Sequence, residues 1–527
     1  MAIRRIAIAL ALAAFALPLG PRGAAAQRAD DVLRGLVEGL AAQPVVAGER
    51  VERVEQIARL YAASGYAPLW PEPKATALRR ALLAAENDGL DPWLYHLEVI
   101  DALAGEHPGP ASRRATELDV LRTAALVALV HDLRWGRARP TSVARVPAGA
   151  DDQALARLVG AADLGAEIAA LRPDHFTYRG LGNALARLRA IERSGGWLRL
   201  PPGDALRPGT FDARVVLLRQ RLASEGYLRG TLRPTADFDS TLASAVRAFQ
   251  HHHGLNEDGI VGRTTVAELN VPVGGRIDQV RINLERARWI APSLPDTFLV
   301  VNIAGAKLYL IRDGAIVHEA RVIVGRDYTR TPVFSGRLER IELNPYWTVP
   351  ESIVDEVLAA AGREPGYLER QRFRALDEDG RPVAVSAAEL LSHSAASLPW
   401  TLRQDPGPLN PLGRIKFYFP NAFSVYLHDT PARDLFAREE RLFSHGCIRV
   451  QDPFRLAELL LDEPARWTRA SLESAAATDE HRLMPLSRPV FVLIQYWTAS
   501  TDEHGTLHFY RDVYGRDPAL LRELDGG

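Results

Sequence analysis

Apolar residues recur at intervals of three and four over the first part of the chain, from about residue 31 to residue 198. The stretches VERVEQIARLYAASGY, ATALRRALLAAENDGL and LDVLRTAALVALVHDLRWG all show this spacing. Such spacing places the apolar side chains on one face of a helix. We therefore predict a helical domain over residues 31–200. Its polar residues form no recognisable site, so we interpret the helices as a scaffold.

A stretch rich in Pro and Gly, LRLPPGDALRPG at 198–209, separates this region from a second helical pattern. FDARVVLLRQRLASEGYL, DFDSTLASAVRAFQHHHGL and TTVAELN predict a module of three short amphipathic helices over residues 210–272. Three consecutive histidines, His251–His253, point in different directions on a helix and have no acidic or cysteine partner at ligand spacing, which argues against a metal site. The expected core consists of Leu217, Leu218, Leu222, Val246, Phe249, Leu255, Val261 and Leu269.

The pattern changes to alternating and β-branched residues after Arg276. DTFLVVNIAGAKLYLIRDGAIVHEARVIVG predicts a meander of strands with turns at Ala304–Gly305 and Asp313–Gly314. Further strands are predicted in RLERIELNPYWTVP, in RIKFYFPNAFSVYLHD and in VFVLIQYWTASTDEHGTLHFYRDVYG, where Asp502–Gly505 makes a hairpin turn.

Helical patterns such as ESIVDEVLAAAG interrupt these strands between about residues 351 and 408. An insertion that leaves a sheet and returns to it commonly covers a site, so we expect a helical lid there. The predicted fold class is thus multidomain α+β, with a β-rich domain over residues 296–500 and a C-terminal hairpin and tail over residues 501–527.

The chain begins MAIRRIAIALALAAFALPLGPRGAAAQ, with two arginines before an apolar run and small residues after it. This order predicts a secretory signal peptide over residues 1–26. The run is shorter than the roughly 20 residues of a membrane-spanning helix, although an uncleaved signal would hold the protein at the inner membrane. We expect a periplasmic protein. The formal net charge of -1 argues against nucleic acid as a partner.

The chain has a single cysteine, Cys447, in the segment RLFSHGCIRVQDP. In an oxidising compartment it has no internal disulfide partner, so it is either an inert core residue or a reactive thiol. Ser444, His445, Gly446 and Arg449 surround it, and a buried inert cysteine has no use for such neighbours. The segment therefore favours a catalytic thiol.

A cysteine nucleophile needs a base or a cation close by, because an ordinary thiol is only slightly ionised at neutral pH. His428, in the separate strand FSVYLHD, is the predicted base, and we expect it to lower the pKa of Cys447. Gly446 permits a sharp turn, and the main-chain N–H groups of residues 445–447 could form an oxyanion hole. Arg449 lies on the same side of an extended segment as Cys447 and could bind a substrate carboxylate.

SHGCIRV, preceded by YLHDTP, resembles the signature of the L,D-transpeptidases, cysteine enzymes that cross-link bacterial peptidoglycan. AVRAFQ, GLNEDGIVG and TTVAELN resemble the three-helix peptidoglycan-binding module of cell-wall enzymes. Together with the helical region and the lid, the chain is similar to the long Gram-negative members. The resemblance implies that Cys447, activated by His428, attacks a tetrapeptide stem before its terminal D-alanine. The thioester then passes to the diaminopimelate amine of a second stem, which gives a 3-3 cross-link without metal or cofactor.

The resemblance also places His445, Gly446 and Arg449 in the family motif, with Ser444 directly before it. The third member of the family's triad is often the main-chain carbonyl after the base, here that of Asp429, whose carboxylate is an alternative orienter. Implied partners are peptidoglycan stem peptides and glycan, other cell-wall synthesis enzymes, and carbapenems, which acylate the family's cysteine. Residues that either line the donor site or pack in the core are Tyr346, Trp347, Tyr418 and Asn421.

Other activities would use the same thiol. Water in place of the amine gives an L,D-carboxypeptidase or endopeptidase, and a protein acceptor gives a lipoprotein-to-peptidoglycan transferase. A catalytically inactive wall-binding scaffold is a further alternative, although it would have little reason to retain His428, Gly446, Cys447 and Arg449 together. The sequence alone does not separate transfer from hydrolysis.

Overall fold

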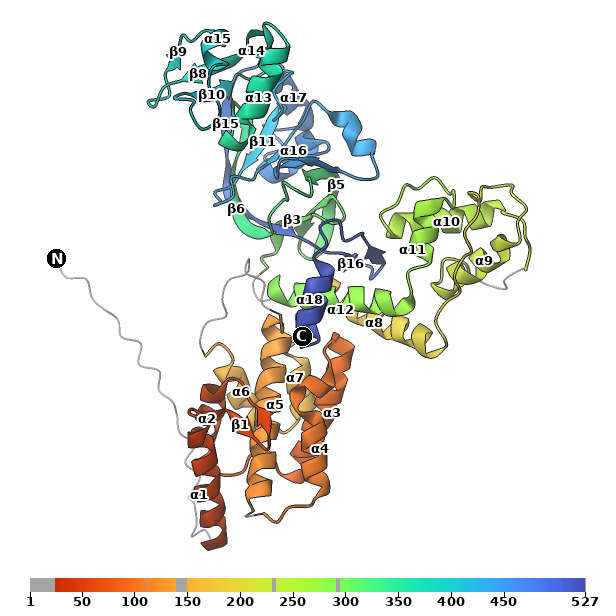
Figure 1. Cartoon of the computed structure of the whole chain (residues 1–527), viewed down its shortest axis with the longest axis vertical. Coiled ribbons are helices and arrows are strands. Elements are labelled where there is room, and N and C mark those ends of the chain that lie inside the picture. Colours follow the sequence, from red (N-terminus) through yellow and green to blue (C-terminus); the bar gives the residue numbers. More distant parts are fainter. Residues whose placement is uncertain (1–23, 111, 139–148, 230–233, 291–293, 527) are drawn as a thin grey trace, which may run out of the picture. The chain divides into compact units, whose positions relative to one another are not determined.

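The computed structural model describes residues 24–110, 112–138, 149–229, 234–290 and 294–526 (Figure 1). Most of the expected signal peptide, residues 1–23, lies outside this part of the chain. The chain divides into two compact units. The first holds most of the chain up to Arg172, and the second holds the chain from Pro173 onward with two short earlier segments. No helix in the described ranges is long and apolar enough to cross a membrane.

The first unit is a bundle of helices around α5 (Arg113–Trp135), which is buried on nearly every side and buries polar side chains, such as Asp119, together with its apolar ones (Figure 1). The carboxylate of Asp119 on α5 accepts hydrogen bonds from Tyr61 Oη at 2.6 Å and from the main-chain N–H of Leu69 at 3.1 Å. These bonds fasten the loop before α3 to α5. The remaining elements of the region are α1 (Ala24–Gly39), β1 (Val45–Val46), β2 (Glu49–Arg50), α2 (Val54–Ala63), α3 (Glu72–Ala84), η1 (Ala85–Asp88), η2 (Pro92–Tyr95), α4 (Leu97–Gly105), α6 (Asp152–Gly160) and α7 (Leu164–Ala169).

The helical scaffold was expected to reach residue 200, but helix α8 (Phe176–Arg193) belongs to the second unit. It packs on α12 (Val273–Ile290) through Leu181 and Leu185, which contact a shared apolar cluster with Val280. The periodicity of α8 is that of the preceding helices, so the sequence pattern does not show which unit buries its apolar face.

The predicted three-helix module is present as α9 (Arg214–Ser224), α10 (Ser240–His252) and α11 (Arg263–Leu269). Asp239 begins α10 by accepting a hydrogen bond from the main-chain N–H of Leu242 at 2.8 Å. The predicted core is confirmed. Seven of its eight residues are buried in one cluster, and Leu217 packs against that cluster partly buried.

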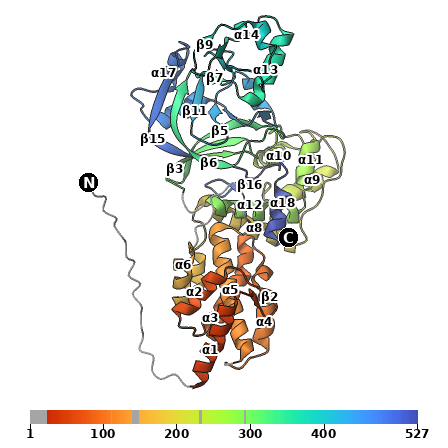
Figure 2. The same cartoon turned by 60° about the vertical axis from the view of Figure 1, so that its left-hand side comes forward.

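A nine-stranded sheet forms the centre of the second unit (Figure 2). Its order is β13-β5-β14-β12-β11-β6-β15-β3-β4, and β5 also pairs with β4, so the sheet closes on itself. The expected meander is confirmed in β3, β4 and β5. The strands are β3 (Thr297–Asn302), β4 (Lys307–Arg312), β5 (Ala315–Gly325), β6 (Phe334–Leu343), β11 (Ile415–Tyr418), β12 (Leu427–His428), β13 (Leu442–Ser444), β14 (Ile448–Val450) and β15 (Arg482–Gln495).

The insertion between β6 and β11 is not purely helical as expected. It contains a four-stranded sheet of order β7-β10-β8-β9 and has its own apolar core. The strands are two to four residues long, too short to show the alternation by which strands are recognised in a sequence. We call this insertion the lid; its elements are β7 (Trp347–Thr348), α13 (Glu351–Arg363), α14 (Tyr367–Arg370), β8 (Phe373–Leu376), β9 (Pro382–Val383), α15 (Ala387–Leu390) and β10 (Thr401–Gln404).

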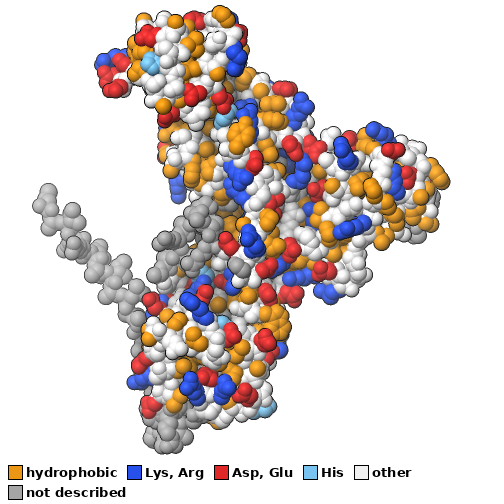
Figure 3. All heavy atoms as spheres, in the orientation of Figure 1, with side chains coloured by type: hydrophobic (Ala, Val, Ile, Leu, Met, Phe, Trp, Pro, Cys, Tyr) orange, Lys and Arg blue, Asp and Glu red, His pale blue; other side chains and the backbone are white. Residues whose placement is uncertain are grey.

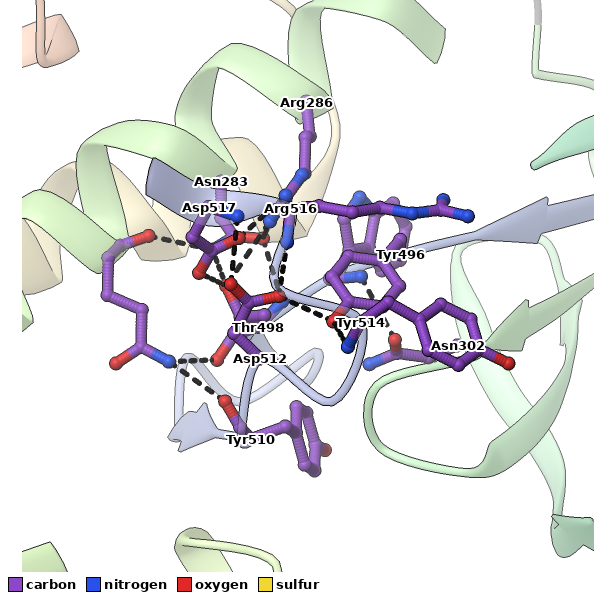
Figure 4. A network of polar contacts seen from close by, with 12 residues as sticks. Asn283, Arg286, Asn302, Tyr496, Thr498, Tyr510, Asp512, Tyr514, Arg516 and Asp517 are labelled. Atoms are coloured by element: carbon purple, nitrogen blue, oxygen red, sulfur yellow. Dashed lines mark hydrogen bonds and ion pairs between the residues drawn. The ribbon is translucent and has the colours of Figure 1, made fainter. Parts of the chain in front are cut away.

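The C-terminal segment is more than a hairpin and tail. The predicted hairpin is β16 (Ala499–Thr501) with β17 (Leu507–Phe509), and α18 (Asp517–Leu524) follows. Figure 4 shows a polar network that joins this segment to α12: Asp517 accepts hydrogen bonds from Thr498 and from Arg286, each at 2.7 Å. The same network continues through Asp512 to Tyr496 Oη at 2.6 Å. The other elements of the second unit are η4 (Arg433–Ala437), α16 (Pro453–Leu461) and α17 (Arg469–Ala476).

Acidic and basic side chains are interspersed over the face drawn in Figure 3, without a large area of one sign. This distribution agrees with the near-neutral composition of the chain.

Candidate active site

One face of the sheet carries two rows of side chains that run across β6, β11, β12 and β14. We call the first the charged row: Glu342 pairs with Lys416, Lys416 with His428, and His428 with Arg449. Side chains two residues apart on a strand share a face, so a second row lies beside it on the same face. We call this second row the thiol row, and it consists of Arg340, Tyr418, Tyr426 and Cys447.

The residues between the two rows point to the other side of the sheet. Ile341, Phe417, Leu427 and Ile448 are all fully buried in the apolar core beneath it. The core thus fixes the register: a slip of one residue in any strand would exchange a buried apolar side chain for a member of a row.

Contacts within the thiol row hold its aromatic side chains in place. The rings of Tyr418 and Tyr426 stack with centroids 5.4 Å apart, and the Arg340 guanidinium lies 3.5 Å from the Tyr418 centroid. Tyr418 was predicted either to line the donor site or to pack in the core. It lies on the polar face of the sheet, in the same row as Cys447.

The turn that presents Cys447 depends on Gly446, whose φ of 113° is a conformation that residues with a side chain rarely adopt. Ser444 stabilises the turn from inside, since its hydroxyl donates to the Cys447 carbonyl at 2.5 Å and accepts from the Gly446 N–H at 3.1 Å. The Gly446 N–H is therefore engaged by Ser444. Of the expected oxyanion donors at residues 445–447, this leaves the N–H groups of His445 and Cys447.

His428 is buried, and its Nδ1 lies 2.5 Å from the main-chain carbonyl oxygen of Asp429. Because a carbonyl only accepts, Nδ1 carries the proton and Nε2 is left as the basic nitrogen. The Asp429 carboxylate is engaged elsewhere, accepting from the Arg414 N–H at 2.8 Å and pairing with Arg433 at 3.4 Å. Of the two orienters that the sequence left open, the carbonyl makes the contact with His428.

The resting pair is neutral. Burial, reinforced by the charges of Arg449 and Lys416, lowers the pKa of His428 to about 3, against the opposing effects of hydrogen bonds to the main chain at Asp429 and Leu412. Burial also raises the pKa of the Cys447 thiol, whose Sγ lies 3.8 Å from the Ser424 carbonyl oxygen. The expectation of a lowered thiol pKa is therefore wrong for the free protein, because desolvation outweighs the favourable charges of Lys416 and Arg449.

Arg449 is partly buried, and burial together with the charge of Arg326 lowers its pKa. Its Nε is buried and has no hydrogen-bond partner among the described residues. The guanidinium thus retains donor capacity on the face that carries Cys447.

The lid reaches the site through α13. Glu356 Oε1 lies 3.0 Å from His445 Nε2, and Glu356 is largely exposed. His445 is therefore directed at the lid in this structure, whereas His428 lies in the row beside the thiol.

The remaining predicted binding residues lie in other surroundings. Asn421 organises a loop: its amide donates to the carbonyls of Phe419 and Val425 and accepts from main-chain N–H groups. Trp347 packs against the apolar core of the lid. Tyr346 is partly exposed and lies beneath the Arg403 guanidinium, 4.3 Å from its ring centroid.

Several supporting residues have no signal in the sequence. Thr331 Oγ1 donates to the Gly446 carbonyl and accepts from the Gly325 N–H, both at 2.9 Å. Tyr514, from the C-terminal segment in Figure 4, donates to the Gly325 carbonyl at 2.6 Å. These contacts brace the Cys447 turn, but a Thr and a Tyr at distant positions carry no motif that would reveal them.

Three consecutive histidines, the last two residues of α10 and His253 directly after it, have three different environments. His251 pairs with Glu257 at 2.9 Å, His252 Nδ1 lies 3.2 Å from Tyr227 Oη, and His253 is buried against Phe249. A cavity of about 280 Å³ opens beside His251 and His252. Within the described ranges, no group of three or more His, Cys, Asp or Glu side chains is arranged to hold a metal ion.

Comparison with known families agrees with this geometry. Residues 296–478 match the family described as the L,D-transpeptidase catalytic domain (YkuD). Residues 55–185 match a scaffold domain family, and residues 212–269 match the family described as "Putative peptidoglycan binding domain". The chain carries an L,D-transpeptidase catalytic domain.

Two named relatives are similar to parts of this chain. A protein of Haemophilus influenzae named "Putative L,D-transpeptidase" is 34% identical over 253 residues, which are 47% of this chain and 50% of that protein. The N-acetylmuramoyl-L-alanine amidase CwlM of Mycobacterium tuberculosis is 42% identical over 79 residues, 14% of this chain and 20% of its own. The matched region thus spans half the length of the Haemophilus relative.

Solved structures similar to this chain include L,D-transpeptidases of Xylanimonas cellulosilytica and Stackebrandtia nassauensis. The first is 17% identical, covers 56% of this chain and 99% of its own, and has a TM-score of 0.19. The second is 12% identical, covers 56% of this chain and 97% of its own, and has a TM-score of 0.22. At these TM-scores the likeness carries no argument about the site.

Proposed function

We propose that this protein is a peptidoglycan L,D-transpeptidase that forms 3-3 cross-links between tetrapeptide stems through a thioester on Cys447. The observation that carries the proposal is the placement of His428 and Cys447 in adjacent rows of one sheet face, with His428 Nδ1 held by the Asp429 carbonyl. That hydrogen bond leaves the basic Nε2 of a neutral imidazole to accept the thiol proton.

In the proposed first step, the Cys447 sulfur forms a bond to the carbonyl carbon between the third and fourth stem residues. The thiol proton passes to His428, and the carbon–nitrogen bond then breaks as His428 gives that proton to the departing amine of the fourth residue. The main-chain N–H groups of His445 and Cys447 would stabilise the oxyanion. Since thiol and imidazole are both neutral at rest, the proton transfer accompanies the attack instead of preceding it.

In the second step, the diaminopimelate amine of another stem attacks the thioester carbon and the Cys447 sulfur leaves. His428 removes the proton from the attacking amine and returns it to the sulfur. The atoms and charges balance without a metal or cofactor. The match of residues 212–269 to a peptidoglycan-binding family supports a wall substrate, and the signal peptide predicted over residues 1–26 supports export to the periplasm.

Intact-mass measurement after incubation with a carbapenem tests the thiol. We expect the wild type to gain the mass of one inhibitor molecule and Cys447→Ser to gain none, because a serine hydroxyl is not activated by this pair. His428→Ala should be acylated at least a hundredfold more slowly, since the thiol then has no base. Acylation of Cys447→Ser at the wild-type rate would contradict the assignment of the nucleophile.

Products formed from purified tetrapeptide stems then distinguish transfer from hydrolysis. Dimers joined through diaminopimelate support the proposed cross-linking, whereas tripeptides alone would show that water resolves the thioester. Incubation with a lipoprotein acceptor and peptidoglycan tests attachment of protein to the wall by the same thiol.

A further inference from the structure

Lys416 lies in the charged row directly beside His428, in register across β11 and β12. It is one of three lysines in the chain, with Lys74 and Lys307, while the other basic residues are arginines. Lys416 lies outside the motif SHGCIRV that surrounds Cys447. Its place next to the base suggests a part in the reaction.

The Lys416 ammonium is largely enclosed, with only 16% of its side chain exposed. The carboxylate oxygen Glu342 Oε2 lies 3.5 Å from Lys416 Nζ, which is longer than a normal charge-assisted hydrogen bond. Glu342 Oε1 is closer to the Arg340 guanidinium, at 3.1 Å. The ammonium lies over the Tyr426 ring, 4.4 Å from its centroid. An aromatic face thus holds the cation in position while donors on the nitrogen stay available.

Lys416 and Arg449 occupy the two positions that flank His428 in the charged row. Together with Arg340 and Glu342, they form a group of three cations and one anion, with a net charge of +2. An uncompensated positive charge at a largely buried site is unfavourable unless an anion arrives to balance it.

The reaction brings such an anion to this place. His428 must come within hydrogen-bond reach of the departing amine in order to protonate it. In an α-amino acid the carboxylate is separated from that amine by a single carbon, so it lies within about 5 Å of the imidazole. The cations that flank His428 in register, Lys416 and Arg449, are placed to meet that carboxylate.

We propose that Lys416 and Arg449 together bind the terminal carboxylate of the donor stem and thereby restrict cleavage to stems that end one residue beyond the attacked bond. Lys416 is a specificity-determining residue in this account. The carboxylate is fixed between the two cations, and the departing amine is consequently aimed at His428. This inference rests on the proposed function and names the part of the substrate that the site recognises.

The experiment compares two donors: a tetrapeptide stem with a free terminal carboxylate and the same stem with a terminal carboxamide. Release of the terminal residue gives kcat/KM for each donor. The variants are Lys416→Met, which keeps the length but not the charge, and Lys416→Arg, which keeps the charge. Lys307→Met is the matched control, because Lys307 lies on β4 and pairs with Glu319 at 2.7 Å.

We expect the wild type, Lys307→Met and Lys416→Arg to prefer the carboxylate donor. Lys416→Met should lose about tenfold or more of that preference, through a higher KM for the carboxylate donor and little change for the carboxamide, as expected for one lost charge-assisted hydrogen bond. Equal losses on both donors, or an unchanged ratio, would overturn the inference.

The rate of Cys447 alkylation by iodoacetamide between pH 6 and pH 10 provides a second measurement. A Lys416 that acts only by tuning the thiol would move the alkylation midpoint and leave the donor ratio unchanged, which also overturns the inference. If Lys416→Met does not fold, Lys416→Gln undergoes the same measurements. A wild type that cleaves neither donor contradicts the proposed function itself, whereas an active wild type with an unchanged ratio in Lys416→Met contradicts only the role of Lys416.

Discussion

At the scale of single residues, the site depends on Gly446 as much as on the reacting pair. Its φ of 113° turns the chain so that Ser444 can bond to both neighbouring peptide groups. A Cβ at Gly446 would have its nearest neighbours at 3.9 Å, which is an ordinary van der Waals contact without a clash. The need for glycine therefore comes from the backbone conformation and not from crowding.

Gly446→Ala should slow carbapenem acylation by about tenfold to a hundredfold, because backbone strain of about 1–3 kcal/mol is relieved only by distorting the turn. The measurement is the acylation rate by mass spectrometry. Gly380→Ala is the matched control: Gly380 has a φ of 76° in the lid, and a Cβ there meets nothing within 4 Å. A wild-type rate for Gly446→Ala, with the control also unchanged, would show that the turn tolerates a side chain.

The sequence reveals residues whose type is rare or whose neighbours are unusual. Cys447 stands alone in the chain and lies within a cluster of Ser, His, Gly and Arg, so it was identified from composition and local pattern. Lys416 and Glu342 were not identified, because their places depend on the pairing of strands more than 70 residues apart. Asn421 was expected either to line the donor site or to pack in the core, and the structure instead shows its amide bonded within its own loop.

At the scale of elements, the helices and the longer strands were predictable and the lid was only partly so. The apolar residues of α10 recur with the helical period of 3.6, and β3 is a run of mostly apolar residues. The lid strands, such as β7 with two residues, have no detectable period. The contact between α13 and the Cys447 turn, through Glu356 and His445, could not be predicted from the sequence, because these two residues are 89 positions apart.

Glu356→Gln should loosen α13 from the turn. The pair is exposed on the Glu356 side, so the effect is modest: we expect hydrogen exchange over Glu351–Arg363 to rise by no more than about fivefold. Glu351→Gln, on the same helix, is the control that removes a carboxylate without touching His445. Exchange rates in Glu356→Gln equal to those of this control would show that the contact does not hold the helix.

At the scale of the whole molecule, buried histidines link stability to pH. His508 on β17 faces His251, His252, Lys307 and Asp502, and burial with the charge of His252 lowers its pKa to about 3. In the unfolded chain it titrates near pH 6.5. Between these pH values, His508 binds a proton in the unfolded state but not in the folded state. The contribution of His508 to stability is therefore complete above pH 6.5 and is lost as the pH falls toward 3.

His508→Gln should therefore make the pH dependence of unfolding shallower by up to about 1.4 kcal/mol per pH unit between pH 6.5 and pH 4. Urea unfolding at several pH values in that range gives the slope. His504→Gln is the matched control in the same hairpin, since the His504 side chain is 81% exposed. A slope in His508→Gln identical to the wild type would exclude His508 as a source of acid sensitivity.

The lid begins and ends on two neighbouring, hydrogen-bonded strands, since Leu343 of β6 pairs with Ile415 of β11. In topological terms it is the loop of a β-hairpin, enlarged into a small folded body with a core of its own. Loop length adds little to the free energy of closing a hairpin. The lid is therefore an insertion that evolution or protein engineering could shorten to a tight turn or replace. The sheet and both rows of side chains would keep their register.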